Sequence, residues 1–197
     1  MIDINKTQRK ILIFLATHPE KQFTIRGISR ELDKPYPLIY NNIKKLESFG
    51  FVIRKSIPPA QSIELNEHAP LSLMLQLEFE RKEIFLAKYP WVRVMLNDLL
   101  SRSKTPFLVL LVFGSYAKET QTSKSDIDLL FISMEKSDFS DIENAAKVYT
   151  KVKKGINIVD INDFKEMIKT DQYNIGNEAK KHHIILFGAD MFYYLVR

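Results

Sequence analysis

The chain has 197 residues, 45% of them hydrophobic and 27% charged, which supports one or two folded domains and excludes a compositionally disordered protein. Its longest apolar run, Phe107 to Phe113, is far shorter than the roughly 18 residues that a membrane-spanning helix needs. The absence of cysteine excludes disulfides and thiolate metal sites and fits a reducing compartment. Because the first residues also lack the pattern of a secretion signal, we expect a soluble cytoplasmic protein with no membrane partner.

The basic excess lies in the first third of the chain. Residues 1–65 contain 11 Lys and Arg against 6 Asp and Glu, whereas residues 66–197 contain 18 of each kind. This asymmetry indicates an anionic partner for the N-terminal part, usually nucleic acid. A basic face that is merely solvated is the alternative that charge alone leaves open.

Apolar residues recur at helical spacing through the first fifty residues and then at strand spacing. The pattern predicts helices at 7–17, 24–32 and 37–49. Pro37 suits the first turn of the third helix, and Gly50 suits the position just after its end. Two short strands, 51–55 and 62–65, are predicted around a proline-bearing turn.

This order of elements, with the stretch NNIKKLESFGFVIRK, resembles a winged helix-turn-helix domain over about residues 6–65, and the DNA-binding domain is predicted at residues 1–66. The resemblance implies that the third helix enters the major groove of double-stranded DNA while the hairpin contacts the backbone or minor groove. Use of the same fold for protein contacts is the alternative. The implied DNA-binding residues are Arg26, Arg30, Tyr36, Tyr40, Asn41, Lys44, Lys45, Arg54 and Lys55.

Residues 67–103 read as a helical connector that Pro90 divides into two parts. The connector carries more apolar positions than packing against one small domain requires. These positions are therefore expected to pack on the second domain or on a twin subunit across a two-fold axis. A homodimer would also suit a DNA-binding module that reads paired half-sites.

A third pattern, α/β in character, occupies residues 104–197. The run from Phe107 to Phe113 predicts a strand covered on both faces. It ends at Gly114-Ser115, and a polar stretch then leads to a second strand that begins around Asp126-Ile127-Asp128. Because this mixed segment follows a first half that is mostly helical, the fold class of the whole chain is predicted as α+β.

The stretch GSYAKETQTSKSDIDLLF resembles the minimal nucleotidyltransferase family, which has the DNA polymerase β-like fold with a mixed sheet and helices. The family usually has GSxARG followed by SDIDL. This chain departs from that pattern at Lys118, where arginine is common, and at Glu119, where glycine is common. Lys118 keeps the positive charge, but Glu119 makes the turn less permissive.

The resemblance implies that a nucleoside triphosphate binds at Gly114, Ser115, Lys118 and Ser125. Gly114 permits close approach of the backbone, and amides at a helix start can donate to phosphate oxygens. Asp126 and Asp128, two residues apart on a strand, share one face and suit a Mg²⁺ ion. The implied reaction is attack of a hydroxyl on the α-phosphate, with release of pyrophosphate.

Active members use a third acid on a later strand, and here the matching residue in Ile156-Asn157-Ile158-Val159 is Asn157. Asn157 is neutral and cannot act as a base. Asp160 is the nearest acid and the third catalytic candidate after Asp126 and Asp128. Three residues from Asn157, however, it falls on the opposite strand face unless a bulge intervenes, so capping of the next helix is the favoured alternative. His182 and His183 are expected to contact solvent or backbone rather than a metal.

The sequence therefore predicts a DNA-binding regulator fused to a nucleotidyltransferase domain that binds Mg²⁺ and a nucleoside triphosphate. Nucleotidyl transfer to a hydroxyl is expected only if a third acid is present in space. The alternatives are an inactive nucleotide-sensing transcriptional regulator and an antitoxin-like partner protein. The acceptor, the base, the DNA site and the oligomeric state do not follow from the sequence.

Overall fold

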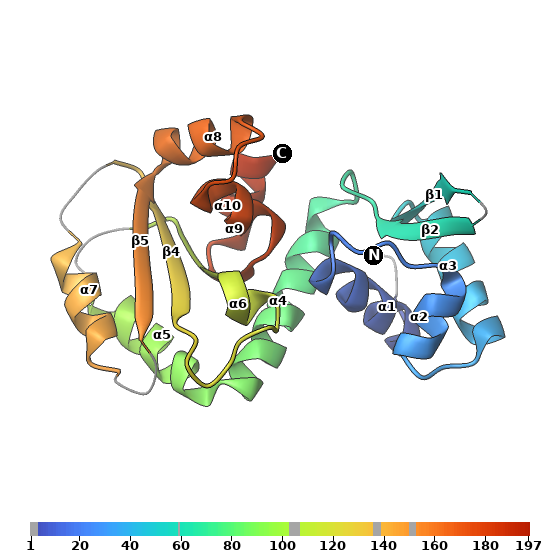
Figure 1. The fold of residues 1–197 in the computed structure, drawn as a ribbon, viewed down its shortest axis with the longest axis horizontal. Coiled ribbons are helices and arrows are strands. Elements are labelled where there is room, and N and C mark those ends of the chain that lie inside the picture. The colour runs from blue at the N-terminus through green and yellow to red at the C-terminus, as the bar shows by residue number, and fades with distance from the viewer. Residues whose placement is uncertain (1–3, 59, 103–106, 136–138, 150–152) are drawn as a thin grey trace. The chain divides into compact units, whose positions relative to one another are not determined.

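The computed structural model describes residues 4–58, 60–102, 107–135, 139–149 and 153–197 (Figure 1). The chain forms two compact units, Met1–Leu77 and Glu78–Arg197. The division falls inside α4 (Leu71–Lys88), so that one continuous helix carries residues of both units. Among the described helices, none combines the length and apolar character needed to cross a membrane.

The first unit contains three helices followed by an antiparallel hairpin. These elements are α1 (Lys6–Thr17), α2 (Ile25–Glu31), α3 (Tyr36–Ser48), β1 (Val52–Ile57) and β2 (Ala60–Leu65). They match the helices and strands predicted from the apolar spacing. Asn5 begins α1 with a capping box, in which its side chain accepts from the amides of Thr7 and Gln8.

The hairpin of the first unit extends to the segment that precedes α2. β1 and β2 pair from Val52–Leu65 to Ile57–Ala60. Phe23 adds an isolated antiparallel bridge to β2, in which the Ile63 amide donates to the Phe23 carbonyl at 2.8 Å. Ile63 is fully buried, so this bridge ties the region between α1 and α2 to the hairpin and to the core.

The second unit is built on a mixed sheet in the order β5-β4-β3-β6. Its strands are β3 (Val109–Phe113), β4 (Ile127–Ser133), β5 (Lys154–Asp160) and β6 (Ile184–Phe187). β4 is antiparallel to β3 and parallel to β5, and β6 is antiparallel to β3. Every residue of β3 is buried, as the continuous apolar run predicts.

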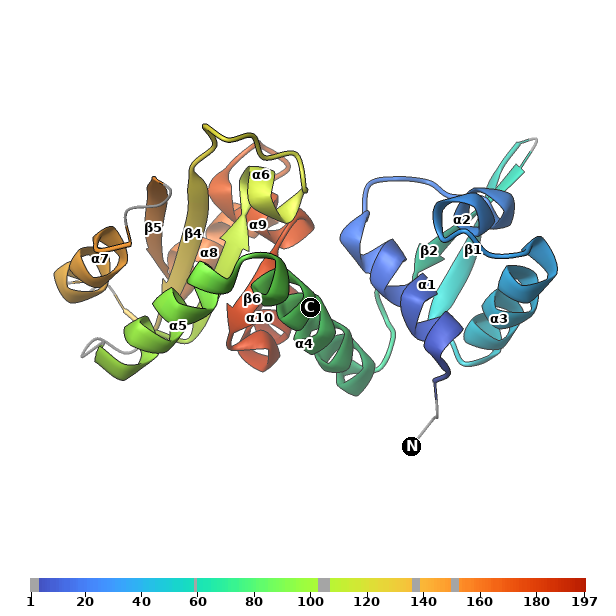
Figure 2. The same ribbon diagram turned by 90° about the horizontal axis from the view of Figure 1, so that it is seen from below.

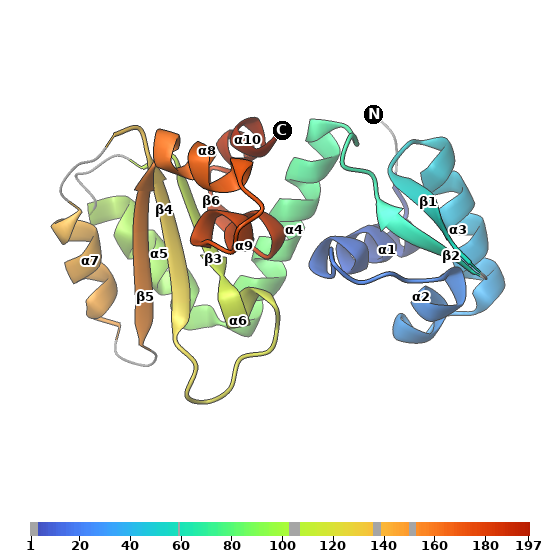
Figure 3. The same cartoon turned by 45° about the horizontal axis from the view of Figure 1, so that its top comes forward.

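Helices cover both faces of this sheet (Figure 2 and Figure 3). α5 (Pro90–Arg102) and α7 (Ser140–Lys147) lie on one face, and α8 (Ile161–Lys169), α9 (Ile175–Lys181) and α10 (Ala189–Val196) lie on the other. The core beneath α5 and α7 includes Ile127, Leu129 and Phe131. Because strand residues alternate between faces, Asp128 lies on the face covered by α8, α9 and α10.

The segment expected to be a separate connector is divided between the two units. The last part of α4 and all of α5 belong to the second unit, and Phe85, Val92 and Met95 enter its core. A helix break precedes Pro90, as predicted. The end of α4 and all of α5 join the second unit because one face of its sheet needs apolar side chains to cover it. The expected boundary after residue 103 lies outside the described residues.

Candidate functional site

The turn between β3 and β4 begins with a glycine that no other residue can replace without strain. β3 ends at Phe113, and the short helix α6 (Gly114–Ala117) follows at once. Gly114 has φ 66°, and a Cβ built on it would lie 2.4 Å from Oδ2 of Asp128. The glycine is therefore required both by the left-handed backbone and by the carboxylate packed against it.

A second glycine contacts the same carboxylate from the other neighbouring strand. Gly155 of β5 is the register partner of Asp128, and a Cβ on Gly155 would lie 2.6 Å from Oδ1 of Asp128. The Asp128 carboxylate is thus held between the backbones at Gly114 and Gly155. Gly155 was not predicted as a site residue from the sequence, although a glycine in a strand is a recognised mark of close backbone approach.

The negative charges around Asp128 reinforce one another. Asp126 is exposed and lies just before β4, while Asp128 is half-buried. Burial raises the pKa of Asp128, and the negative charges of Asp126 and Glu178 raise it further. Burial also raises the pKa of Tyr116, helped by Tyr89 and Asp126. This end of the sheet is therefore a site where a cation would relieve repulsion between carboxylates.

The structure brings Lys118 to a partner that the sequence analysis missed. Lys118 ends α6, and its Nζ lies 2.5 Å from Oε1 of Glu178 on α9. Ser125 shapes the loop before Asp126, since its hydroxyl accepts from the Thr122 amide at 2.9 Å and its own amide donates to the Thr122 carbonyl at 3.1 Å. Only the fold could reveal Glu178, because α9 is distant from the motif in sequence.

Glu119 occupies the position where glycine is common in the minimal nucleotidyltransferase pattern, and the backbone conformation at Glu119 explains the preference for glycine. Its φ is 58°, in the left-handed region that side chains other than glycine rarely adopt. The carboxylate forms an exposed ion pair with Lys88 of α4 at 3.0 Å. The turn requires a left-handed backbone that glycine adopts freely, and Glu119 therefore adopts it with strain, as the departure from the family pattern predicts.

The candidate third acid on β5 does not lie at the site. Asp160 pairs with Ser133, five residues along the strands from the Asp128–Gly155 pair, or about 16 Å at ~3.3 Å per residue. Its Oδ1 accepts from the Asp163 amide at 2.8 Å, so Asp160 caps α8. The assignment of Asp160 as catalytic is corrected on this ground, and the capping alternative is confirmed.

Asn157 does not complete the site either. It pairs with Leu130, two residues beyond Asp128, and its amide donates to the Leu129 carbonyl at 3.4 Å. The residue directly beside Asp128 is Gly155, so β5 offers no acidic side chain there. Among the described residues, no group of three or more His, Cys, Asp and Glu could hold a metal. Two carboxylates still fit Mg²⁺, which commonly takes one or two carboxylates and fills its shell with phosphate oxygens and water.

Residues 96–189 match the family model described as Polymerase beta, Nucleotidyltransferase. The match supports the nucleotidyltransferase fold. It covers the whole mixed sheet with Gly114, Asp126, Asp128 and α9. A comparison with curated proteins finds no match for the chain.

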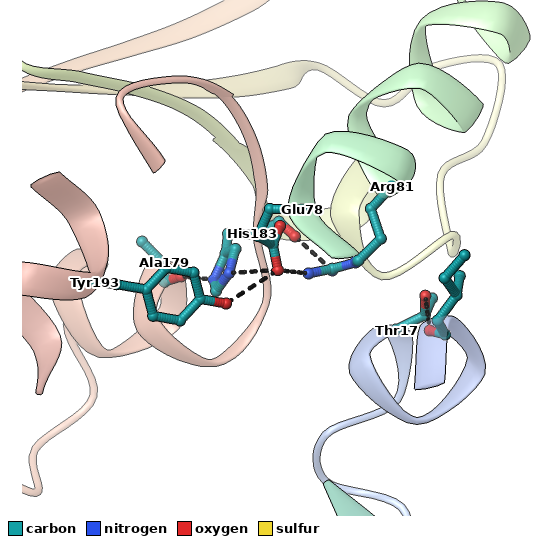
Figure 4. Close-up of polar contacts among 7 residues, drawn as sticks. Thr17, Glu78, Arg81, Ala179, His183 and Tyr193 are labelled. Atoms are coloured by element: carbon teal, nitrogen blue, oxygen red, sulfur yellow. Dashed lines mark hydrogen bonds and ion pairs between the residues drawn. The ribbon is translucent and has the colours of Figure 1, made fainter. Parts of the chain in front are cut away.

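A buried polar cluster in the second unit joins α4 to α10 and to the segment between α9 and β6 (Figure 4). Arg81 Nη1 lies 2.6 Å from Glu78 Oε1, and Arg81 Nη2 donates to the His183 carbonyl at 2.7 Å. Tyr193 donates its hydroxyl to Glu78 at 3.1 Å, and His183 Nδ1 donates to the Ala179 carbonyl at 2.8 Å. The backbone contact expected for His183 is confirmed, whereas its buried acidic neighbour was not foreseen.

The candidate DNA-binding residues divide into two groups. One group, on α2 and α3, is exposed: Arg26, Arg30, Tyr36, Tyr40, Asn41, Lys44 and Lys45. The other is on β1 and is engaged within the unit. Arg54 Nη2 donates to Glu47 Oε2 at 2.7 Å, and Lys55 pairs with Glu64 at 2.6 Å. Donating a hydrogen bond to Glu47 raises the pKa of Arg54, and donating one to Glu64 raises the pKa of Lys55.

Proposed function

We propose that the second unit binds a nucleoside triphosphate with Mg²⁺ at the end of the sheet formed by Gly114, Ser115, Asp126 and Asp128. The observation that carries the proposal is the Asp128 carboxylate, held between two glycine backbones next to the charge of Asp126. A half-buried carboxylate beside a second negative charge costs stability unless a cation neutralises it, so the arrangement favours a bound cation.

In this proposal Asp126 and Asp128 hold the metal. The ion supplies charge neutralisation for the phosphate groups. The left-handed Gly114 lets the phosphates approach the backbone, and Lys118 provides a positive charge on the same turn. Ser125 holds the loop that presents Asp126.

We also propose that the first unit is a winged helix-turn-helix that binds double-stranded DNA. Its support is the order of three helices and a hairpin, together with the Phe23 bridge. The exposed Lys44 and Lys45 of α3 add charge suited to phosphates. With both units, the chain is proposed to act as a nucleotide-responsive DNA-binding regulator of the cytoplasm, working as a homodimer on paired half-sites.

Nucleotidyl transfer to a hydroxyl acceptor is the second candidate function. The family match favours it. The missing acid beside Asp128 on β5 opposes it, because the general base for the acceptor is then absent from its usual strand. Nucleotide sensing is therefore the primary proposal and transfer the second.

The test is incubation of the full chain with α-labelled nucleoside triphosphates and Mg²⁺, beside the double variant Asp126→Asn/Asp128→Asn. We expect the wild type to bind the labelled nucleotide and to retain it on a filter. The double variant should retain none. Stable label transfer to an acceptor in the wild type alone would establish the second candidate. Equal retention by both proteins would contradict the proposed site.

A further inference from the structure

Lys118 and Glu178 form an ion pair at the edge of the proposed phosphate site. Their atoms Nζ and Oε1 are 2.5 Å apart. The side chain of Lys118 is 37% exposed and that of Glu178 only 11%, so the carboxylate approaches the turn from the protein side while the ammonium remains open to solvent. An ion pair that is partly shielded in this way is stronger than a fully exposed one.

Resting on the nucleotide binding proposed above, we propose that Glu178 competes with the phosphate groups of the nucleotide for Lys118. A bound phosphate must then displace the carboxylate or share the ammonium with it. Glu178 therefore acts as an internal anion that weakens binding of phosphate groups and sets the nucleotide concentration at which the unit responds.

The neighbouring charges strengthen this competition. Glu178 lies close enough to Asp128 for its charge to raise the pKa of that carboxyl. A triphosphate approaching the turn thus meets the negative charges of Glu178, Asp126 and Asp128. The position of α9 is fixed by the buried cluster through the Ala179 carbonyl, which follows Glu178 directly in sequence. The backbone at Glu178 is therefore held in place, and Glu178 can leave Lys118 only by a change in its own side-chain conformation unless α9 moves.

The experiment compares binding of ATP and of inorganic tripolyphosphate, in EDTA and in Mg²⁺, to the full-length wild type and four variants. Glu178→Gln keeps the size of the side chain and removes the competing charge. Glu119→Gln is the matched control, because it removes a carboxylate one residue from Lys118 that pairs with Lys88 instead. Lys118→Met and the double variant Lys118→Met/Glu178→Gln complete a double-mutant cycle.

We expect Glu178→Gln to bind both probes roughly three- to tenfold more tightly than the wild type, and Glu119→Gln to bind within about twofold of it. The gain from Glu178→Gln should vanish in the Lys118→Met background. The inference is overturned if Glu178→Gln binds no more tightly than a wild type that does bind, or if its gain in affinity persists in the Lys118→Met background. Either result leaves the proposed nucleotide site in place. Absence of binding by every protein overturns the proposed nucleotide site, and the inference with it. Circular dichroism of each variant checks that it is folded.

Discussion

At the scale of single residues, Glu119 is the clearest case of strain in the second unit. Its φ of 58° is costly for a residue with a Cβ, and its ion pair with Lys88 is exposed. We predict that Glu119→Gly stabilises the unit by roughly 0.5–1 kcal/mol, because glycine adopts the left-handed conformation without strain. Urea unfolding followed by tryptophan fluorescence measures the change.

Glu119→Ala separates strain from charge in that prediction. Alanine loses the ion pair and keeps the strained backbone, so its unfolding midpoint should not exceed that of the wild type. If Gly and Ala change the free energy of unfolding equally, the ion pair and not the backbone governs this position.

Glu78 links the stability of the same unit to pH. Burial alone would raise the pKa of Glu78, but the charge of Arg81 and the contact with His183 outweigh it and lower the pKa from 4.5 to about 2. A carboxyl whose pKa is lower in the folded state stabilises the protein above its unfolded pKa. We predict that this contribution, on the order of 3 kcal/mol, is complete above pH 4.5 and is lost as the pH falls toward 2.

Glu78→Gln tests the link, since the variant has no carboxyl to titrate. It should be less stable than the wild type at pH 7 by about 3 kcal/mol or more, because Arg81 is left buried without its ion-pair partner. Its loss of stability between pH 4.5 and 2 should also be smaller. Glu83→Gln on the same helix removes an exposed partner of Arg93 and should follow the wild-type profile. Parallel profiles for Glu78→Gln and the wild type would refute the assignment.

At the scale of elements, α3 carries the prediction for DNA. Lys44 and Lys45 are exposed on α3, whereas Arg54 and Lys55 of β1 are engaged with Glu47 and Glu64. We expect Lys44→Ala/Lys45→Ala to weaken binding to duplex DNA at least tenfold and to lower the slope of log affinity against log salt by about 2. Fluorescence anisotropy at several salt concentrations provides both quantities.

Lys10→Ala is the control for net charge, because Lys10 is exposed on α1 of the same unit. The control should leave the salt slope within about half a unit of the wild type. A slope that falls equally in both variants would mean that overall charge, and not α3, governs binding.

The elements themselves were largely predictable, because local signals define them. The apolar run of β3, the break before Pro90 and the spacing of α1 to α3 all depend on residues close together in sequence. The strand register is not local. It placed Gly155 beside Asp128 and moved Asp160 to the far end of the sheet. Apolar spacing carries no information on that register between β4 and β5.

The polar contacts of the second unit could not be predicted from the sequence for the same reason. Arg81 and His183 are 102 residues apart in sequence, and Glu78 and Tyr193 are 115 apart. Glu178 reaches Lys118 only because α9 packs near β3. Charged residues in helical segments are expected to face solvent, so neither the buried cluster nor the anion beside Lys118 left a signal in the sequence.

At the scale of the whole molecule, each unit has its own core, and ligands should therefore stabilise the units separately. Trp91, the sole tryptophan of the sequence, packs against the core of the second unit and reports on it alone. We predict that Mg²⁺ and ATP at about 100 times the dissociation constant stabilise the fluorescence transition by roughly 2.7 kcal/mol. The Asp126→Asn/Asp128→Asn variant should show no such stabilisation. Stabilisation of the variant by the same amount would place the nucleotide elsewhere.

A nucleotide-responsive regulator requires more than two binding units, since the two sites must share free energy. α4 is one helix that belongs to the first unit up to Leu77 and to the second from Glu78, and it also carries Arg81 of the buried cluster. We predict that saturating Mg²⁺ and ATP change the affinity for DNA, and that saturating DNA changes the affinity for ATP by the same factor, as linkage demands. Anisotropy with labelled DNA and calorimetry with ATP measure the two factors. If both factors equal one, the two units bind their ligands independently and the chain is not a nucleotide-responsive regulator. A factor of five or more assigns that role to the chain, because coupling of that size requires two states of the protein that both ligands distinguish.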